Sequence, residues 1–237
     1  MAENLAKPPF PFTGPGLLIA RSRITSPELS EDVFERWYNE VHIPDVLAVG
    51  TISAAYRFRN SNPAAEVPYL AVYTVPEFSK VDMGKLGALP MAHEMLPGGG
   101  TITDFVDIDS QFYKLTQEEA QKLSQDAYFP VLLSAAMEPA AGGEADFDAW
   151  YREEHLDQMA KEPGHKRARR YRLAFQNTPA GMSGADAPSW LTLYEFDESG
   201  KEKLGTEVKP LDPMTPWTKR MLETAQRVEA AIYYRIF

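Results

Sequence analysis

FERWYNEVH (34–42) and FDAWYREEH (147–155) are two versions of one nine-residue segment, and five of the nine positions are identical. The identical pairs are Phe34 and Phe147, Trp37 and Trp150, Tyr38 and Tyr151, Glu40 and Glu153, and His42 and His155. In both copies the large apolar residues recur at the spacing that places them on one face of a helix. Each segment therefore predicts a helix that packs an aromatic stripe against a core, and each ends on one of only four histidines in the chain.

The repeat extends over most of the 237 residues, because strands and helices follow in the same order in both halves. Apolar or alternating runs between turn residues predict strands at 16–24, 51–59, 68–75 and 101–115, and again at 128–137, 165–175, 189–196 and 227–237. Ser30 is a candidate N-cap for the first helix, and Pro44 predicts that this helix ends at about Ile43. The region 77–95 has a mostly helical pattern, interrupted by glycine and proline.

Each half has the order β-α-β-β-α-β, which predicts an α+β fold built from two tandem ferredoxin-like units. The expected parts are an irregular segment at 1–15, the first unit at 16–115, a linking helix at 116–127 and the second unit at 128–237. Thr116 and Glu119 form the capping-box pattern of the linking helix. One face of each sheet has no helix and many apolar positions, and such a face is unfavourable in water. We therefore expect the two antiparallel sheets to pack face to face as an intramolecular α/β barrel.

The motif F-x-x-W-Y-x-E-x-H, followed by IPDV (43–46), resembles the dimeric α/β-barrel superfamily and, within it, the EthD-like proteins. The patterns G-x-x-x-x-x-Y-R and Y-L-x-x-Y in the strands carry the same resemblance, which covers nearly the whole chain twice. The resemblance implies a small-molecule pocket between each sheet and its helices. Relatives with this fold include cofactor-free monooxygenases, polyketide cyclases, lactone isomerases, decarboxylases and haem peroxidases. Most have one unit and dimerise, so the fused form departs from the common pattern.

Composition and charge argue against several kinds of partner. A net charge of −10 is unfavourable for nucleic-acid binding, which needs a basic surface. The basic run KRARR (166–170) indicates either a nuclear-import or phosphate-binding patch, or a strand whose long side chains flank a pocket or reach solvent. The chain has no cysteine, which excludes disulfides and thiolate sites and favours a reducing, cytoplasmic compartment. No apolar stretch approaches the length of a membrane span, so no membrane partner is expected.

Three of the four histidines are candidate catalytic residues. On a helical wheel His42 lies at the edge of the apolar stripe, about 160° from Glu40, so these two residues cannot form a catalytic pair within one helix. His42 and His155 either act as a general acid or base in a pocket or bond a backbone carbonyl at the helix end. His93 occurs in one unit only, which makes it either a single catalytic group or a surface histidine.

Seven further residues are candidates for substrate binding: Tyr38, Tyr151, Arg57, Arg172, Tyr73, Tyr194 and Trp217. An alignment that inserts one residue in the second copy matches Arg57 with Arg172. Each of these arginines is expected to meet either a glutamate or an anionic oxygen of a ligand. Tyr73 and Tyr194 alternate into a sheet face, where a phenol can donate a hydrogen bond. Trp217 lies in the segment that corresponds to the surroundings of His93.

No dedicated metal site is expected, because the histidines show no pair at metal-ligand spacing. No cofactor is expected either; a haem would need His155 or His93 as its proximal ligand. We expect the chain to be a monomer with pseudo-twofold symmetry or a dimer of such monomers, with a small molecule as its partner.

The leading functional hypothesis is a cofactor-independent enzyme acting on a hydrophobic aromatic or polyketide-like small molecule. Its expected chemistry is that of a lyase or cyclase, meaning decarboxylation, dehydration or ring closure with a histidine as general acid or base. The alternatives are a cofactor-free monooxygenase and a non-catalytic barrel that binds a small ligand or serves in stress. A cavity of at least about 300 Å³ beside His42, His93 or His155 would favour the enzyme.

Overall fold

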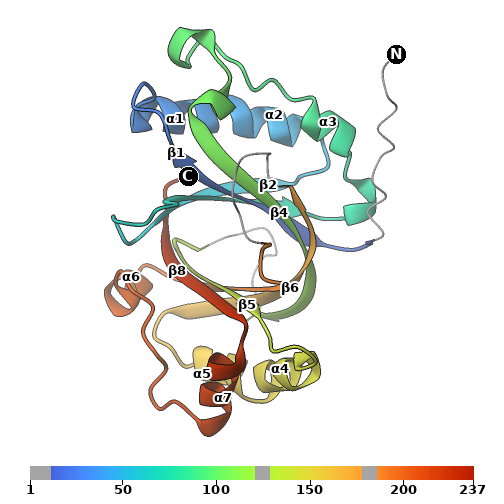
Figure 1. Ribbon diagram of the computed structural model, residues 1–237, viewed down its shortest axis with the longest axis vertical. Helices are drawn as coiled ribbons and strands as arrows, with labels where there is room; N and C mark the ends of the chain where they lie inside the picture. The colour runs from blue at the N-terminus through green and yellow to red at the C-terminus, as the bar shows by residue number, and fades with distance from the viewer. Residues whose placement is uncertain (1–11, 121–128, 178–185) are drawn as a thin grey trace.

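Eight antiparallel strands close into one barrel in the computed structural model, which describes residues 12–120, 129–177 and 186–237 (Figure 1). The strands are β1 (Gly16–Ile24), β2 (Ala54–Asn60), β3 (Tyr69–Val75), β4 (Val106–Ala120), β5 (Val131–Glu138), β6 (His165–Asn177), β7 (Trp190–Phe196) and β8 (Arg227–Arg235). The first half contributes β4-β1-β3-β2 as neighbours and the second half contributes β8-β5-β7-β6. This equivalent order in both halves confirms the tandem ferredoxin-like units and the intramolecular barrel.

The two seams between the units differ in length. At one seam β4 and β6 pair from Ser110↔Asn177 to Ala120↔Arg167. At the other seam β2 and β8 pair only from Phe58↔Arg235 to Asn60↔Tyr233. The barrel is therefore held firmly on one side and closed by a short ladder on the other.

The repeated segment forms a helix that is interrupted by a π turn in both copies. The first copy consists of α1 (Glu31–Trp37), η1 (Tyr38–His42) and α2 (Ile43–Ala48), and the second of α4 (Glu144–Trp150), η5 (Tyr151–His155) and α5 (Leu156–Met159). Ser30 caps α1, since its side chain accepts from the Val33 N–H, as predicted. The predicted end at Ile43 is wrong: Pro44 lies in the first turn of α2, where a proline costs the helix no hydrogen bond.

The remaining helices are short: η2 (Phe78–Lys80), α3 (Met83–Gly87), η3 (Pro97–Gly99), η4 (Ile102–Asp104), α6 (Ser199–Leu204) and α7 (Pro216–Thr224). The helical pattern expected for 77–95 gives only η2 and α3, because glycine and proline interrupt it. The linking helix expected at 116–127 is wrong at its start, because 116–120 continue β4 and pair with β6. Residues 121–127 lie outside the described residues.

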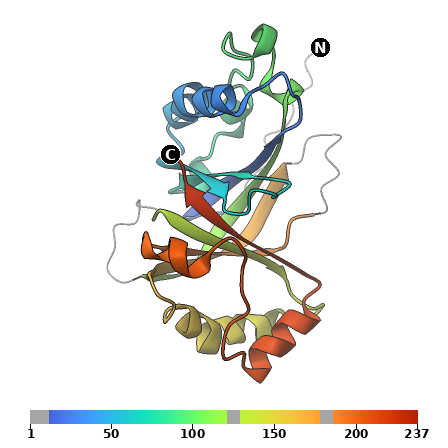
Figure 2. The ribbon, with the colours of Figure 1, turned by 90° about the vertical axis from the view of Figure 1, so that its left-hand side faces the viewer.

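Three apolar layers hold the molecule together, one inside the barrel and one between each half-sheet and its helices (Figure 2). The barrel interior also holds charged groups from the basic run 166–170. Arg167 and Arg169 both bind the carboxylate of Glu195, and all three residues are buried. Lys166 pairs with Asp197 at 2.7 Å. The run is thus part of strand β6. Its arginines are buried and paired, so it forms no basic surface patch.

Candidate active site

The π turn decides where the repeated histidines lie. In an α-helix, residues five apart are separated by about 140° around the axis, whereas a π turn brings residues i and i+5 over each other. His42 accordingly stacks on Trp37 with ring centroids 5.0 Å apart, and His155 stacks on Trp150 at 4.3 Å. Both imidazoles are thereby drawn from the edge of the helix toward its aromatic, buried side.

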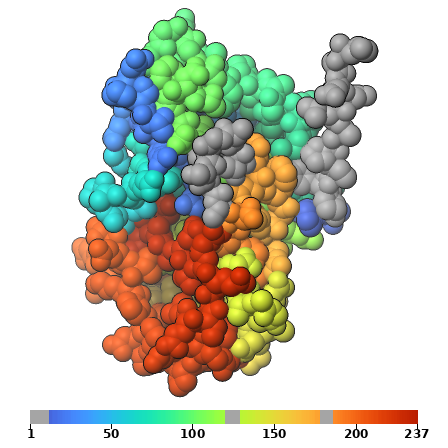
Figure 3. Space-filling model, in the orientation of Figure 1, coloured from blue at the N-terminus to red at the C-terminus, as the bar shows by residue number. Residues whose placement is uncertain are grey.

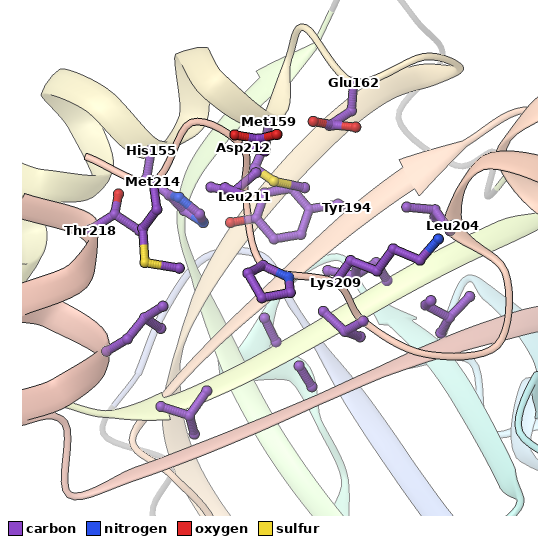
Figure 4. Close-up of a pocket in the computed structure, with 18 of the residues that line it drawn as sticks. His155, Met159, Glu162, Tyr194, Leu204, Lys209, Leu211, Asp212, Met214 and Thr218 are labelled. Atoms are coloured by element: carbon purple, nitrogen blue, oxygen red, sulfur yellow. The ribbon is translucent and has the colours of Figure 1, made fainter. Parts of the chain in front are cut away.

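His155 lines a cavity of about 430 Å³ between the sheet of the second unit and the helices that cover it. Figure 4 shows the His155 imidazole beside the ring of Tyr194, with Met214 and Thr218 close to the histidine. The His155 and Tyr194 ring centroids are 6.0 Å apart and their planes are nearly perpendicular, at 86°. Most other lining residues are apolar and come from β5, α5, β8 and the chain between α6 and α7.

Burial keeps His155 and Tyr194 uncharged at neutral pH. It lowers the pKa of His155 to about 4, with Arg170 adding to the shift and Glu154 opposing it. Burial also raises the pKa of the Tyr194 hydroxyl well above its usual value, and the neighbouring Tyr151 hydroxyl adds to this. The His155 Nδ1 is buried without a hydrogen-bond partner, whereas the buried Tyr194 hydroxyl interacts with the side chains of Tyr151 and Thr192. The site therefore pairs a neutral imidazole, which can accept a proton, with a protonated phenol, which can donate a hydrogen bond.

The same burial predicts that acid destabilises the protein through His42 and His155. Each has a pKa of about 4 in the folded protein and 6.5 as its ordinary value, so the unfolded chain binds more protons between these two values. The free energy of unfolding should fall by up to about 3 kcal/mol per histidine as the pH drops from about 6.5 to about 4. Urea unfolding across this range should show a weaker pH dependence for the double variant His42→Gln/His155→Gln. Equal slopes for the wild type and the variant would contradict the prediction.

The corresponding tyrosines of the first unit are satisfied by each other. The Tyr73 hydroxyl donates to the Tyr38 hydroxyl at 3.1 Å, and both side chains are buried. In the second unit the Tyr151 hydroxyl contacts the Met137 sulfur at 3.8 Å and also interacts with the side chains of Tyr194 and Thr192. The Tyr194 side chain lines the cavity, and its hydroxyl lies beside those of Tyr151 and Thr192.

The expected match of Arg57 with Arg172 is wrong. Arg57 is buried under α1, with its guanidinium 4.4 Å from the Tyr38 ring centroid and bonded to Asn39. Arg170 makes the same contact with Tyr151 at 4.1 Å and is the true counterpart of Arg57. Arg57 and Arg170 are thus separated by the same number of residues as the two repeated helices, so the alignment needs no inserted residue.

Arg172 corresponds instead to Arg59, and both are paired at the surface. Arg172 binds Glu144 at 2.9 Å, and Arg59 binds Glu31 at the same distance. The carboxylate partner anticipated for Arg172 is therefore present, but the residue lies outside the cavity lining. Arg57 and Arg170 are each held between a helix and a strand of their own unit, and neither lines this cavity.

Two other candidates lie away from the cavity. The His93 Nδ1 accepts from the Met95 N–H at 3.1 Å, so this histidine stabilises an irregular turn after α3. The Trp217 Nε1 donates to Asp146 at 3.1 Å on the outer side of α4. Of the predicted site residues, His155, Tyr151 and Tyr194 are brought together at this cavity.

A hydrogen-bond network fixes α7 as a wall of the cavity. The Trp150 Nε1 donates to the Thr218 hydroxyl at 3.1 Å, and that hydroxyl donates to Glu154 at 3.0 Å. Thr215 caps α7 through the Thr218 N–H and also bonds Glu154. The helix of the repeated segment thus holds α7 in place, whereas the chain before α7 bows outward and leaves the cavity open. Figure 3 shows this region hollowed between its orange and red segments.

The first unit uses the equivalent chain segment for packing. Leu96 is buried in the cluster around Trp37, and Leu86, Leu89 and Met95 pack against that cluster. The periodic patterns do not predict the cavity-lining residues after α6, such as Lys209 and Leu211, since these have no counterpart in the repeat. A signal was present only in the difference between the two units over these segments.

Within the described residues, no group of three or more acidic or histidine side chains is placed to hold a metal ion. In the same part of the chain, no helix is both long and apolar enough to cross a membrane.

The fused barrel, with a cavity between one sheet and its helices, has the fold expected for the dimeric α/β-barrel superfamily. No family model matches the sequence. The chain is 31% identical over 196 residues to core atranone cluster (CAC) protein 1 of Stachybotrys chlorohalonatus. The matched region covers 78% of this chain and 82% of that protein. The chain therefore belongs to the family of this protein.

Solved structures with the same fold are much more distant in sequence. An anthrone oxidase-like protein has a TM-score of 0.53 and 10% identity, covering 94% of this chain and 92% of the other. A variant of chlorite dismutase from Candidatus Nitrospira defluvii has a TM-score of 0.54 and 11% identity, covering 94% and 91%. These likenesses show the fold alone, and the closer assignment to EthD-like proteins stays a prediction.

Proposed function

We propose that this chain is a cofactor-independent enzyme that moves a proton on a hydrophobic small molecule bound beside His155. The observation that carries the proposal is the His155–Tyr194 pair on the wall of an apolar cavity of about 430 Å³. This volume lies within the range of small-molecule sites and above the smallest size expected for one, about 300 Å³. One unit carries the site, and the other unit supports the fold.

The pair suits the formation of an enolate. The neutral imidazole of His155 takes a proton from the carbon next to a carbonyl group, and the electron pair of the broken C–H bond moves onto the carbonyl oxygen. The Tyr194 hydroxyl then donates a hydrogen bond to that oxygen, where negative charge develops. Decarboxylation, dehydration and ring closure of carbonyl compounds can all proceed through such an enolate. Lyase or cyclase chemistry is therefore the first candidate.

Exposed apolar side chains around the cavity support a hydrophobic substrate. Large apolar residues rarely remain exposed together unless something covers them. Four lining residues are exposed by more than a third: Val208 at 39%, Met214 at 38%, Leu222 at 38% and Val228 at 43%. A bound ring system would cover these side chains and remove them from water.

The relatives make an oxygenase the second candidate. The name of the relative assigns that protein to the core atranone cluster, and we propose that this chain too acts on a metabolite within such a cluster. The name of the anthrone oxidase-like neighbour, whose likeness is limited to the fold, favours a cofactor-free monooxygenase as the alternative. The same base would serve both reactions, because each begins with removal of a proton from the substrate.

Hydrogen exchange at carbon tests the proposal without knowledge of the natural substrate. We expect the protein to accelerate deuterium uptake next to the carbonyl of 2-tetralone in D2O by at least about 10²-fold over buffer, as followed by proton NMR. Because the base has a pKa of about 4, the rate should rise through that pH and remain level to neutrality wherever circular dichroism shows a folded protein. Binding of 2-tetralone without exchange would overturn the enzyme in favour of a small-ligand carrier.

A further inference from the structure

A second cavity, of about 460 Å³, lies at one end of the barrel interior. Side chains from several strands line it, including Asn60 of β2, Gln111 and Tyr113 of β4, Ser134 of β5 and Tyr233 of β8. These groups are amides, phenols and a hydroxyl, in contrast to the apolar lining around His155. The barrel interior therefore offers a polar compartment that the proposed chemistry does not use.

The two cavities meet at the edge of β8. Val228 and Ala230 line both of them. The ladder between β2 and β8 ends at Asn60↔Tyr233, so it does not reach these two residues. Figure 2 shows β8 crossing the middle of the molecule, with strands of the first unit above it and α7 below. The short seam thus leaves this edge of β8 unpaired by β2 at the point where the two cavities share their lining.

The charges around the polar cavity are already paired. Arg21 binds Glu229 at 3.0 Å, and Arg23 binds Glu66 as well as Asp107. An anionic ligand group would have to compete with Glu229 for Arg21 and would lie near Glu66. The neutral groups are bonded too, since Tyr113 donates to Gln111 at 3.0 Å, but they can exchange such bonds with an uncharged oxygen group without breaking an ion pair. The compartment therefore favours a hydroxyl or carbonyl group over a carboxylate.

We propose that the two cavities form one bipartite site for an elongated amphipathic molecule. Its apolar ring system lies beside His155, its chain passes Val228 and Ala230, and its uncharged oxygen-bearing end lies in the barrel. This inference rests on the proposed function, because it takes the cavity beside His155 as the reacting end. It adds the substrate class: a molecule with an apolar ring system and a remote hydroxyl or carbonyl group.

Fluorescence titration of the full chain with naphthalene derivatives tests the bipartite site. The ligands are 2-alkylnaphthalenes, the matched ω-(2-naphthyl)alkanols and the matched alkanoates, each with a short and a long alkyl chain. We expect the short compounds of the neutral series to bind alike. The long alcohols should bind about tenfold more tightly than the long alkanes, because only they reach the polar compartment. A preference for the long alkanoates over the long alcohols would overturn the assigned chemistry.

Two variants and a control locate the effect. Ser134 lines only the polar cavity, so Ser134→Leu should remove the advantage of the long alcohols and leave the short ligands unaffected. Val228→Trp, at an exposed position, should block the passage and have the same effect on the long alcohols. Ile236→Trp is the matched control, since Ile236 is exposed at 38% and is absent from the lining of both cavities.

The outcomes separate this inference from the proposed function. If short ligands bind and a terminal hydroxyl brings no advantage at any length, the bipartite site is wrong and the enzyme proposal stands. If no naphthalene derivative binds at all, the apolar cavity is not a site and both proposals fail. An advantage that survives in both Ser134→Leu and Val228→Trp would place the hydroxyl elsewhere and overturn the bipartite site.

Discussion

His155→Gln is expected to lower the rate of 2-tetralone exchange by about 10²–10⁴-fold, whereas His42→Gln is expected to leave it unchanged. Both histidines stack on a tryptophan in a π turn, and burial gives both a pKa of about 4. Only His155 lines the cavity of about 430 Å³ with Tyr194 beside it. The rate should therefore separate two residues whose local surroundings are nearly the same.

The pair of variants controls for damage to the fold. Each substitution removes one stacked imidazole, so both variants should lose similar amounts of stability, as measured by urea unfolding at neutral pH. A loss of exchange in His155→Gln alone, at matched stability, would assign the base to the second unit. Equal rates in the two variants would contradict the assignment, because a packing role is the same in both units.

The strands were predictable because their signal is local. Alternating or continuous apolar runs between turn residues identified all eight strands, with errors mainly at the ends. The repeat then determined the pairing, because two β-α-β-β-α-β units with bare faces have few other ways to bury them. The sequence predicts that the fourth strand ends at 115, because Thr116 and Glu119 imitate a capping box, whereas β4 continues to Ala120. Pairing with β6 outweighs that local preference.

The site was only partly predictable. A helical wheel with one α-helical period places His42 at the edge of the stripe, whereas the π turn brings it over Trp37. The alignment of Arg57 with Arg172 followed the adjacent tyrosines. In the structure the arginine under the helix is Arg170, and Tyr171 faces the barrel interior. The cavity itself depends on how the chain after α6 bows outward, and no periodic pattern encodes that path.

Glu195→Gln is expected to cost about 3–5 kcal/mol of unfolding free energy, the largest effect we predict on stability. Glu195 is fully buried in the barrel, where its carboxylate binds Arg167 through two hydrogen bonds of 2.9 and 2.8 Å. The same carboxylate binds the Nη2 of Arg169 at 2.8 Å. The amide of glutamine has a similar volume but no charge, and its NH2 group would point toward a guanidinium. Two buried cations would thus lose the anion they share.

Urea unfolding at neutral pH measures this loss, with Glu144→Gln as the matched control. Glu144 pairs with Arg172 at 2.9 Å on the surface, where a single ion pair contributes at most about 1 kcal/mol. A triple variant, Arg167→Met/Arg169→Met/Glu195→Leu, should recover much of the stability, because it removes the charges together instead of leaving some uncompensated. If Glu195→Gln were as mild as Glu144→Gln, water would have to reach the barrel interior at this end. The charged groups there would then be solvated rather than dependent on one carboxylate.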